Sequence, residues 1–211
     1  DVYDKIDSAF LTFARKNKEE MMKAEEETEE DVLIANPSVC KLIDQRRIEG
    51  YNIAFISDMY LNSQFLRKVL QRNGCCRQED AIYVSCEHNA RKDTGLLYKV
   101  VRNELHPTEW IHYGDNKRSD IKMAKSKGIR AIHINTCHNN AERACSQVST
   151  SMAELARQYR LRHKDNEFAS FAADFVVPAY LPYVIHVLRE ARGMGIRKLY
   201  FLSRDCYILM K

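Results

Sequence analysis

The chain has 211 residues, enough for one or two domains with a sizeable core. Its 33 basic and 29 acidic residues give a formal charge of +4, a balance that does not favour nucleic-acid binding. We find no apolar run long enough to span a bilayer and no secretory leader, so we expect a cytoplasmic protein without membrane insertion.

Seven cysteines are spaced irregularly along the chain. Small oxidised scaffolds are shorter and denser in cysteine, so we expect these thiols to be reduced. The pairs Cys75-Cys76, Cys86-x-His88 and Cys137-His138 offer zinc ligands, but none repeats at the spacing of a zinc finger. We therefore do not expect a zinc site, and we interpret Cys40, Cys145 and Cys206 as packing residues.

The first third of the chain predicts helices. Within residues 1–36, an amphipathic stretch is followed by an acidic, helix-forming run; the stretch places four apolar residues on one helix face, namely Val2, Ile6, Phe10 and Phe13. A second helix is predicted to begin at Pro37, with Asn36 as its cap and Gly50 just beyond its end.

Short apolar strands and helical segments then alternate. The predicted strands are 53–56, 81–85, 110–113 and 129–134, and helices are predicted over 63–73 and 94–105. Strands that alternate with helices of this length imply a parallel, doubly wound sheet. After Asn135 we expect a linker over 136–151, helices over 152–192 interrupted by Pro178 and Pro182, and an apolar strand over 198–203.

Polar residues follow two of these strands. Ser57 and Asp58 come after the first strand, and Asp115, Asn116 and Asp120 come after the third. In open α/β sheets, ligands bind at the carboxyl ends of the strands. Carboxylates there suit Mg²⁺, which one or two carboxylates hold together with waters and phosphate oxygens. The structural alternative is that these side chains only cap turns and helices.

Lys92 lies between these two groups in the sequence and completes an ordered set of motifs. Ser57-Asp58-Met59-Tyr60-Leu61, Lys92-x-x-Gly95-Leu96-x-Tyr98 and Gly114-Asp115-x₄-Asp120 resemble the second, third and fourth motifs of the haloacid dehalogenase-like superfamily. The residues of these motifs look closer still to those of one bacterial branch of predicted hydrolases, which accompany glycan-assembly and glycosyltransferase proteins. The resemblance covers roughly residues 37 to 139.

The resemblance implies an α/β fold with a three-layer, Rossmann-like parallel sheet over residues 37–139. Residues 1–36 would be the remnant of a helical cap, residues 140–195 a linker with helices, and residues 196–211 the start of a second unit of the same kind. It also implies Mg²⁺-dependent hydrolysis of a small phosphate monoester through an aspartyl-phosphate.

The same resemblance assigns roles to single residues. Ser57, Asp58 and Asn116 would bind the phosphorylated substrate, with Ser57 also acting in catalysis. Lys92 would neutralise phosphate charge as a point cation. Asp115 and Asp120 would hold Mg²⁺, although Asp120 would serve equally well to orient Lys92.

The first motif of that superfamily, a strand that ends in the nucleophilic aspartate, has no counterpart before Ser57. We therefore expect the nucleophile and the central strand to lie upstream of Asp1 or to come from another segment. Asp205, after the predicted strand 198–203, is one candidate, but we favour that strand as the start of a second unit. The alternative function is a catalytically degenerate module that binds or scaffolds within a larger glycan-assembly protein.

Overall fold

The computed structural model describes residues 17–134, 139–147, 149–163 and 166–201. The described residues form two compact units, which divide between residues 137 and 138. Three sequence predictions lie outside the described residues: the helix face at Val2 to Phe13, the Cys137-His138 pair and the candidate nucleophile Asp205.

The first unit begins with two helices, α2 (Lys18–Val32) and α3 (Pro37–Ile48). Asn17 and Glu20 form a capping box at the start of α2. The structure confirms Asn36 as the cap of α3, with Pro37 in its first turn. Gly50 follows the end of α3 with a φ of 89°, a left-handed conformation that glycine adopts without steric cost. Neither helix contains a fully buried residue.

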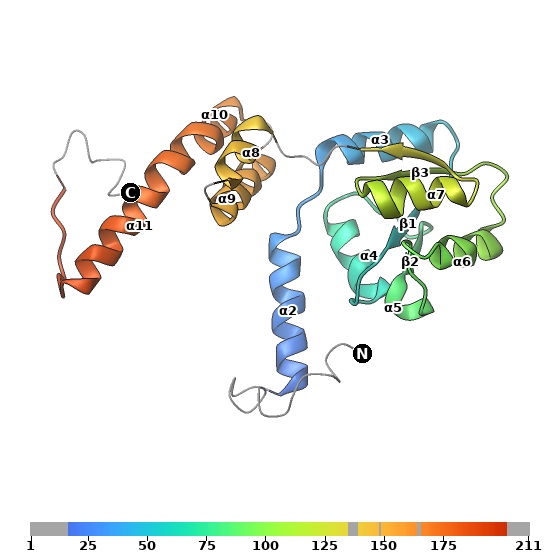
Figure 1. Ribbon diagram of the computed structural model, residues 1–211, viewed down its shortest axis with the longest axis horizontal. Coiled ribbons are helices and arrows are strands. Elements are labelled where there is room, and N and C mark those ends of the chain that lie inside the picture. Colours follow the sequence, from blue (N-terminus) through green and yellow to red (C-terminus); the bar gives the residue numbers. More distant parts are fainter. Residues whose placement is uncertain (1–16, 135–138, 148, 164–165, 202–211) are drawn as a thin grey trace. The chain divides into compact units, whose positions relative to one another are not determined.

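Two pairs of parallel strands form the centre of this unit (Figure 1). In the first pair, β1 (Ala54–Ser57) lies beside β2 (Ala81–Val84), and the connection runs through α4 (Ser63–Arg72). In the second pair, β3 (Ile111–Gly114) lies beside β4 (Arg130–His133). The other helical segments are α5 (Ser85–His88), α6 (Leu96–Leu105), the π-helical η2 (Lys117–Met123) and α7 (Ala124–Ser126).

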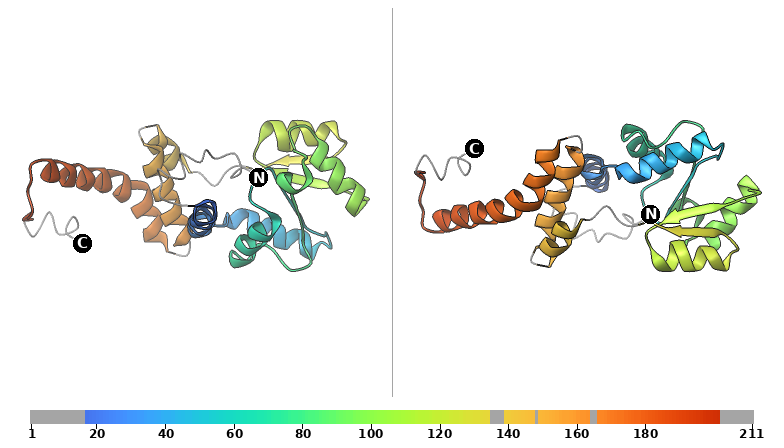
Figure 2. Two further views of the ribbon diagram at one scale, coloured as in Figure 1. Left: turned by 90° about the horizontal axis from the view of Figure 1, so that it is seen from below. Right: turned by 90° about the horizontal axis from the view of Figure 1, so that it is seen from above.

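The prediction of a single three-layer parallel sheet is wrong. The described strands form two separate two-stranded sheets, and each contains only four-residue strands (Figure 2). Parallel pairing and the alternation with helices were anticipated, but β1 pairs only with β2 and β3 only with β4 among the described residues. No described strand joins the two pairs. A strand's hydrophobic pattern shows that it is buried but does not name its partner, and this explains the error.

Helix α6 connects the two sheets through its side chains. Leu97 and Val101 belong to one buried cluster, whereas Tyr98 belongs to another with Ala124 and Ile129. Two partly buried residues pack against both clusters, Ile56 on β1 and Trp110 before β3. The ends of the two strand pairs are therefore held around one helix, and this arrangement positions the polar residues described below.

The second unit is helical in the described residues. It contains α8 (Asn140–Ser146), α9 (Thr150–Arg162), α10 (Glu167–Phe171), η3 (Ala172–Val176) and α11 (Val177–Gly193). Small buried side chains lie on α9, α10 and η3, namely Ala153, Ala156, Ala169 and Ala173, whereas α8 buries Glu142. The buried Glu142 carboxylate accepts a hydrogen bond of 2.8 Å from Arg160 Nε. The stretch 136–151 was expected to be a linker, and it contains α8.

The helical run Glu167–Gly193 bears on the expectation of a protein without membrane insertion, which stays a prediction. By length and composition it is sufficient to cross a membrane, whereas the sequence reading found no such stretch. That reading treated Pro178 and Pro182 as interruptions. In the structure Pro178 lies in the first turn of α11, where proline is tolerated, and Pro182 lies inside a helix that continues past it.

Candidate functional site

Strand β1 ends at the predicted position, and the carboxylate of the next residue, Asp58, lies beside Lys92. Ser57 is the last residue of β1, and Asp58 follows it. The Oδ1 atom of Asp58 accepts a hydrogen bond of 2.9 Å from the backbone N–H of Lys92. This bond ties the turn before α6 to the carboxyl end of β1, so two motifs that are 34 residues apart in the sequence meet in the structure.

The side chain of Lys92 extends from that turn to the second strand pair. Its Nζ donates a hydrogen bond of 2.7 Å to Oδ1 of Asp120, and only 14% of the Lys92 side chain and 4% of the Asp120 side chain are exposed. Charge-assisted hydrogen bonds of this length are among the stronger ones in proteins. Of the two roles that the sequence left open for Asp120, the geometry favours the orientation of Lys92.

Two buried residues complete this network: His112, which the sequence reading did not single out, and Tyr98, the last residue of the Lys92 motif. Nε2 of His112 lies 3.2 Å from Asp120 Oδ1 and 3.1 Å from the Tyr98 hydroxyl. The Tyr98 hydroxyl donates its only proton to the Ser119 carbonyl at 3.0 Å. Tyr98 therefore accepts from His112, so Nε2 carries a proton and also donates to Asp120. The sequence feature that could have pointed to His112 is its inward position in an otherwise apolar strand.

These contacts decide the ionisation of Asp120. Burial by itself would raise the pKa of this carboxyl, but hydrogen bonds from His112 and Lys92 and the charge of Lys92 lower it well below its ordinary value. The carboxylate is thus ionised at neutral pH. Burial and the nearby Asp120 charge raise the pKa of Tyr98, which remains a neutral hydroxyl.

The loop after β3 brings Asp120 into place. Asn116 caps η2 by accepting from the backbone N–H groups of Arg118 and Ser119, and its own N–H donates to Asp120 Oδ2 at 3.1 Å. Gly114 leaves the space that Asp120 fills, because a Cβ atom there would overlap the Asp120 side chain. The Gly-Asp-x₄-Asp spacing is therefore a steric requirement in this fold.

Asp115 and Ser57 stand outside the network. The Asp115 side chain is exposed, and its carbonyl oxygen lies 3.0 Å from His133 Nε2. Ser57 is half-buried. Hydrogen bonds thus join Asp58, Lys92, Asn116 and Asp120, and among the described residues the side chains of Ser57 and Asp115 take no part in these bonds.

Of the two carboxylates predicted to hold Mg²⁺, Asp115 is the one that remains open to solvent. Both oxygens of Asp120 accept hydrogen bonds, whereas the exposed Asp115 carboxylate follows β3 directly. One carboxylate suffices for Mg²⁺ when waters and phosphate oxygens supply the other positions. Within the ranges described, three or more histidine, cysteine or acidic side chains do not converge as a closed metal site.

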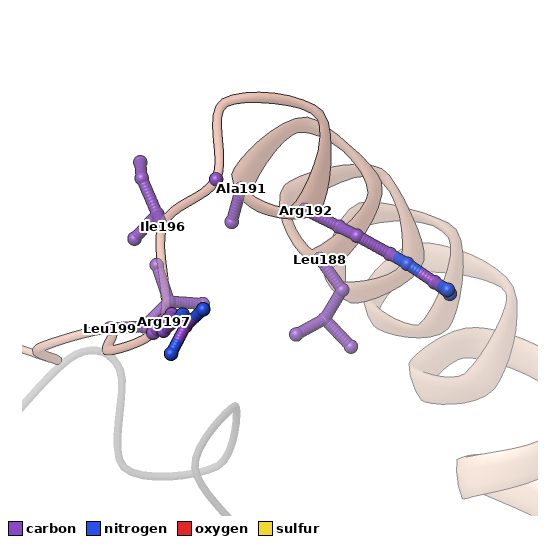
Figure 3. A pocket seen from close by; sticks show the side chains of 7 residues that line it. Leu188, Ala191, Arg192, Ile196, Arg197 and Leu199 are labelled. Atoms are coloured by element: carbon purple, nitrogen blue, oxygen red, sulfur yellow. The ribbon is translucent and has the colours of Figure 1, made fainter.

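Two surface hollows formed by described residues lie elsewhere. One of about 540 Å³ lies where α11 ends, lined by residues such as Leu188, Arg192 and Ile196 (Figure 3). A second, of about 470 Å³, lies at the amino ends of β1 and β2 beside Arg47 and Asp80. Neither hollow is lined by a residue of the Lys92–Asp120 network, which consists of Asp58, Lys92, Tyr98, His112, Asn116 and Asp120.

Comparison of the chain with protein-family models and with curated proteins found no match. Its function is therefore proposed from the chemistry of the site.

We expect Asp115→Asn to abolish or weaken Mg²⁺ binding, because the substitution removes the charge of the accessible carboxylate. Calorimetric titration of Mg²⁺ into the wild type and this variant measures the effect. Asp44→Asn provides a matched control, since Asp44 is a largely exposed carboxylate on α3. Equal heats for the wild type and Asp115→Asn would contradict a Mg²⁺ site at Asp115.

Proposed function

We propose that this chain contributes a phosphate-binding site to a Mg²⁺-dependent phosphohydrolase of the haloacid dehalogenase-like kind. The observation that carries the proposal is the 2.7 Å contact between Lys92 Nζ and Asp120 Oδ1 beside the carboxyl end of β3. Asp120 holds the Lys92 ammonium in one position, and a fixed cation at this edge of a parallel strand pair suits a phosphate group.

Each residue then has a defined task. Lys92 neutralises charge on the phosphate oxygens, and Asp58 fixes the backbone of the Lys92 turn. His112 and Tyr98 hold Asp120 from the protein interior. Mg²⁺ bound at Asp115 would add positive charge on the phosphate when present. Hydrolysis also needs a carboxylate that attacks phosphorus and forms an aspartyl-phosphate, which water then cleaves.

We expect Lys92→Met to weaken the binding of inorganic phosphate by at least about tenfold, which corresponds to one charge-assisted contact. Isothermal titration calorimetry measures the affinity. Lys99→Met is the matched control, because Lys99 lies on the same helix α6 with an exposed side chain. Equal phosphate affinities for the wild type and Lys92→Met would contradict the site.

The alternative is a module that binds the phosphorylated ligand without turnover. The favouring observation is that the Lys92–Asp120 network is complete among the described residues without a carboxylate placed to attack phosphorus. Release of phosphate from an aryl phosphate in the presence and absence of Mg²⁺ separates the two. Mg²⁺-dependent release that Lys92→Met abolishes supports the hydrolase, whereas Lys92-dependent phosphate binding without release supports the module.

A further inference from the structure

Two cysteines from separate segments of the first unit meet in space. Cys40 lies in the first half of α3, and Cys75 follows the turn that ends α4. Their Sγ atoms are 2.7 Å apart, although the residues are separated by 35 positions in the sequence. This distance is only about 0.7 Å longer than a disulfide bond, so little movement is needed to join the two atoms.

The local backbone explains the encounter. Gly74 adopts a left-handed conformation with a φ of 71°, which turns the chain sharply at the end of α4 and directs Cys75 toward α3. Arg47, two turns after Cys40 on α3, donates a hydrogen bond of 3.0 Å from Nη2 to the Cys75 carbonyl. The same guanidinium pairs with the buried Asp80 carboxylate. The two segments are thus held together independently of the sulfur atoms.

The two thiols differ in their access to solvent. Cys75 is only 7% exposed, whereas Cys40 is half-buried. Burial and the hydrogen bond with Cys40 raise the pKa of the Cys75 thiol to about 12, so it is protonated at neutral pH. A disulfide reagent from solution would therefore reach the Cys40 thiol first. The buried Cys75 thiol would then react with the mixed disulfide formed on Cys40.

A bond at this position would have a structural effect, because α3 buries none of its residues. Its attachments to the α4–β2 segment include the Arg47–Asp80 ion pair and the hydrogen bond from Arg47 to the Cys75 carbonyl. A covalent link from Cys40 to Cys75 would fasten α3 to that segment and close a loop that contains β1, Ser57 and Asp58.

We propose that Cys40 and Cys75 form a reversible disulfide by exchange with a low-molecular-weight disulfide such as oxidised glutathione. The Cys40 thiolate attacks one sulfur of the glutathione disulfide, a mixed disulfide forms, and one glutathione thiolate leaves. Cys75 then loses its proton to solvent, its thiolate attacks the Cys40 sulfur, and the second glutathione thiolate leaves. The two protein thiols lose two electrons in all, and one glutathione disulfide becomes two glutathione thiols.

The test exposes the native 211-residue chain to oxidised glutathione, quenches it with acid and maps its peptides by mass spectrometry. We expect one internal cross-link, Cys40 to Cys75, with the loss of two hydrogens, and complete reversal by dithiothreitol. The thermal unfolding midpoint of the first unit should rise by roughly 5 °C on oxidation, because the cross-link restricts the unfolded chain.

Serine variants supply the controls. Cys40→Ser should lose both the cross-link and the rise in midpoint, whereas Cys76→Ser should retain both. Cys76 is adjacent to Cys75 and equally buried, but its thiol donates to the Arg77 carbonyl at 3.2 Å. Stable glutathione on Cys40, a cross-link that involves another cysteine, or no reaction in the wild type would each overturn the proposal. The wild-type peptide map decides this even if Cys40→Ser fails to fold.

Discussion

Asp120→Asn is expected to lower the free energy of unfolding by about 3 kcal/mol, the lower end of the cost of breaking a buried ion pair. The carboxylate accepts from Lys92 Nζ, His112 Nε2 and the Asn116 N–H. An amide has only one oxygen to offer these donors and no charge for the enclosed Lys92 ammonium. The expected cost is at the lower end because Lys92 retains some exposure to water.

Urea unfolding followed by the fluorescence of Trp110 measures this loss, since Trp110 is the only tryptophan and packs on Tyr98. Asp115→Asn is the control, and we expect it to stay within about 0.5 kcal/mol of the wild type, as is usual for exposed positions. A loss for Asp120→Asn no larger than that of the control would show that the ion pair contributes nothing to stability.

The unfolding free energies of the wild type and of Asp120→Asn should depend differently on pH. The pKa of Asp120 is lower in the folded chain than its ordinary value of 3.8. Its contribution to stability is therefore complete above that ordinary value and is lost as the pH falls through the lower, folded value. We expect the difference in unfolding free energy between wild type and Asp120→Asn to be largest at pH 7 and to shrink below about pH 4. A difference that grows on acidification would contradict the assigned ionisation.

The candidate site was predictable from the sequence to the extent that its residues follow strands. Ser57 and Asp115 come directly at strand ends, and the order of Asp58, Lys92 and Asp120 placed them at one edge. The predicted proximity of Lys92 and Asp120 came from the resemblance of their motifs to a known family, because Lys92 follows β2 and Asp120 follows β3, which belong to separate sheets. The cap at Asn36 was predictable because it is local: the Asn36 side chain accepts from a backbone N–H two positions on.

The long-range features were not predictable in the same way. The separation of the β1–β2 and β3–β4 pairs depends on which strand edges meet, and residue patterns do not encode that. His112 lies in an apolar strand and was not singled out, and Tyr98 on α6 was named only as the last residue of the Lys92 motif. Their role follows only from the position of Asp120 between them and Lys92.

Gly114→Ala is expected to damage both stability and phosphate binding. An alanine Cβ at this position would overlap Cβ and Cγ of Asp120, which is buried and has no room to withdraw. Overpacking of this kind costs about 1–3 kcal/mol. Because any displacement of Asp120 also releases the Lys92 ammonium, we expect phosphate affinity to fall by at least about tenfold, as for the loss of one charge-assisted contact.

Gly50→Ala separates this steric effect from the general cost of replacing a glycine. Its added Cβ meets no atom within 4 Å, but its φ of 89° makes alanine strained there. We expect a loss of about 1–2 kcal/mol from backbone strain and an unchanged phosphate affinity, because Gly50 follows α3, away from the strand ends. If Gly114→Ala likewise destabilises the fold yet binds phosphate as the wild type does, the close approach of Asp120 to β3 has no part in positioning Lys92.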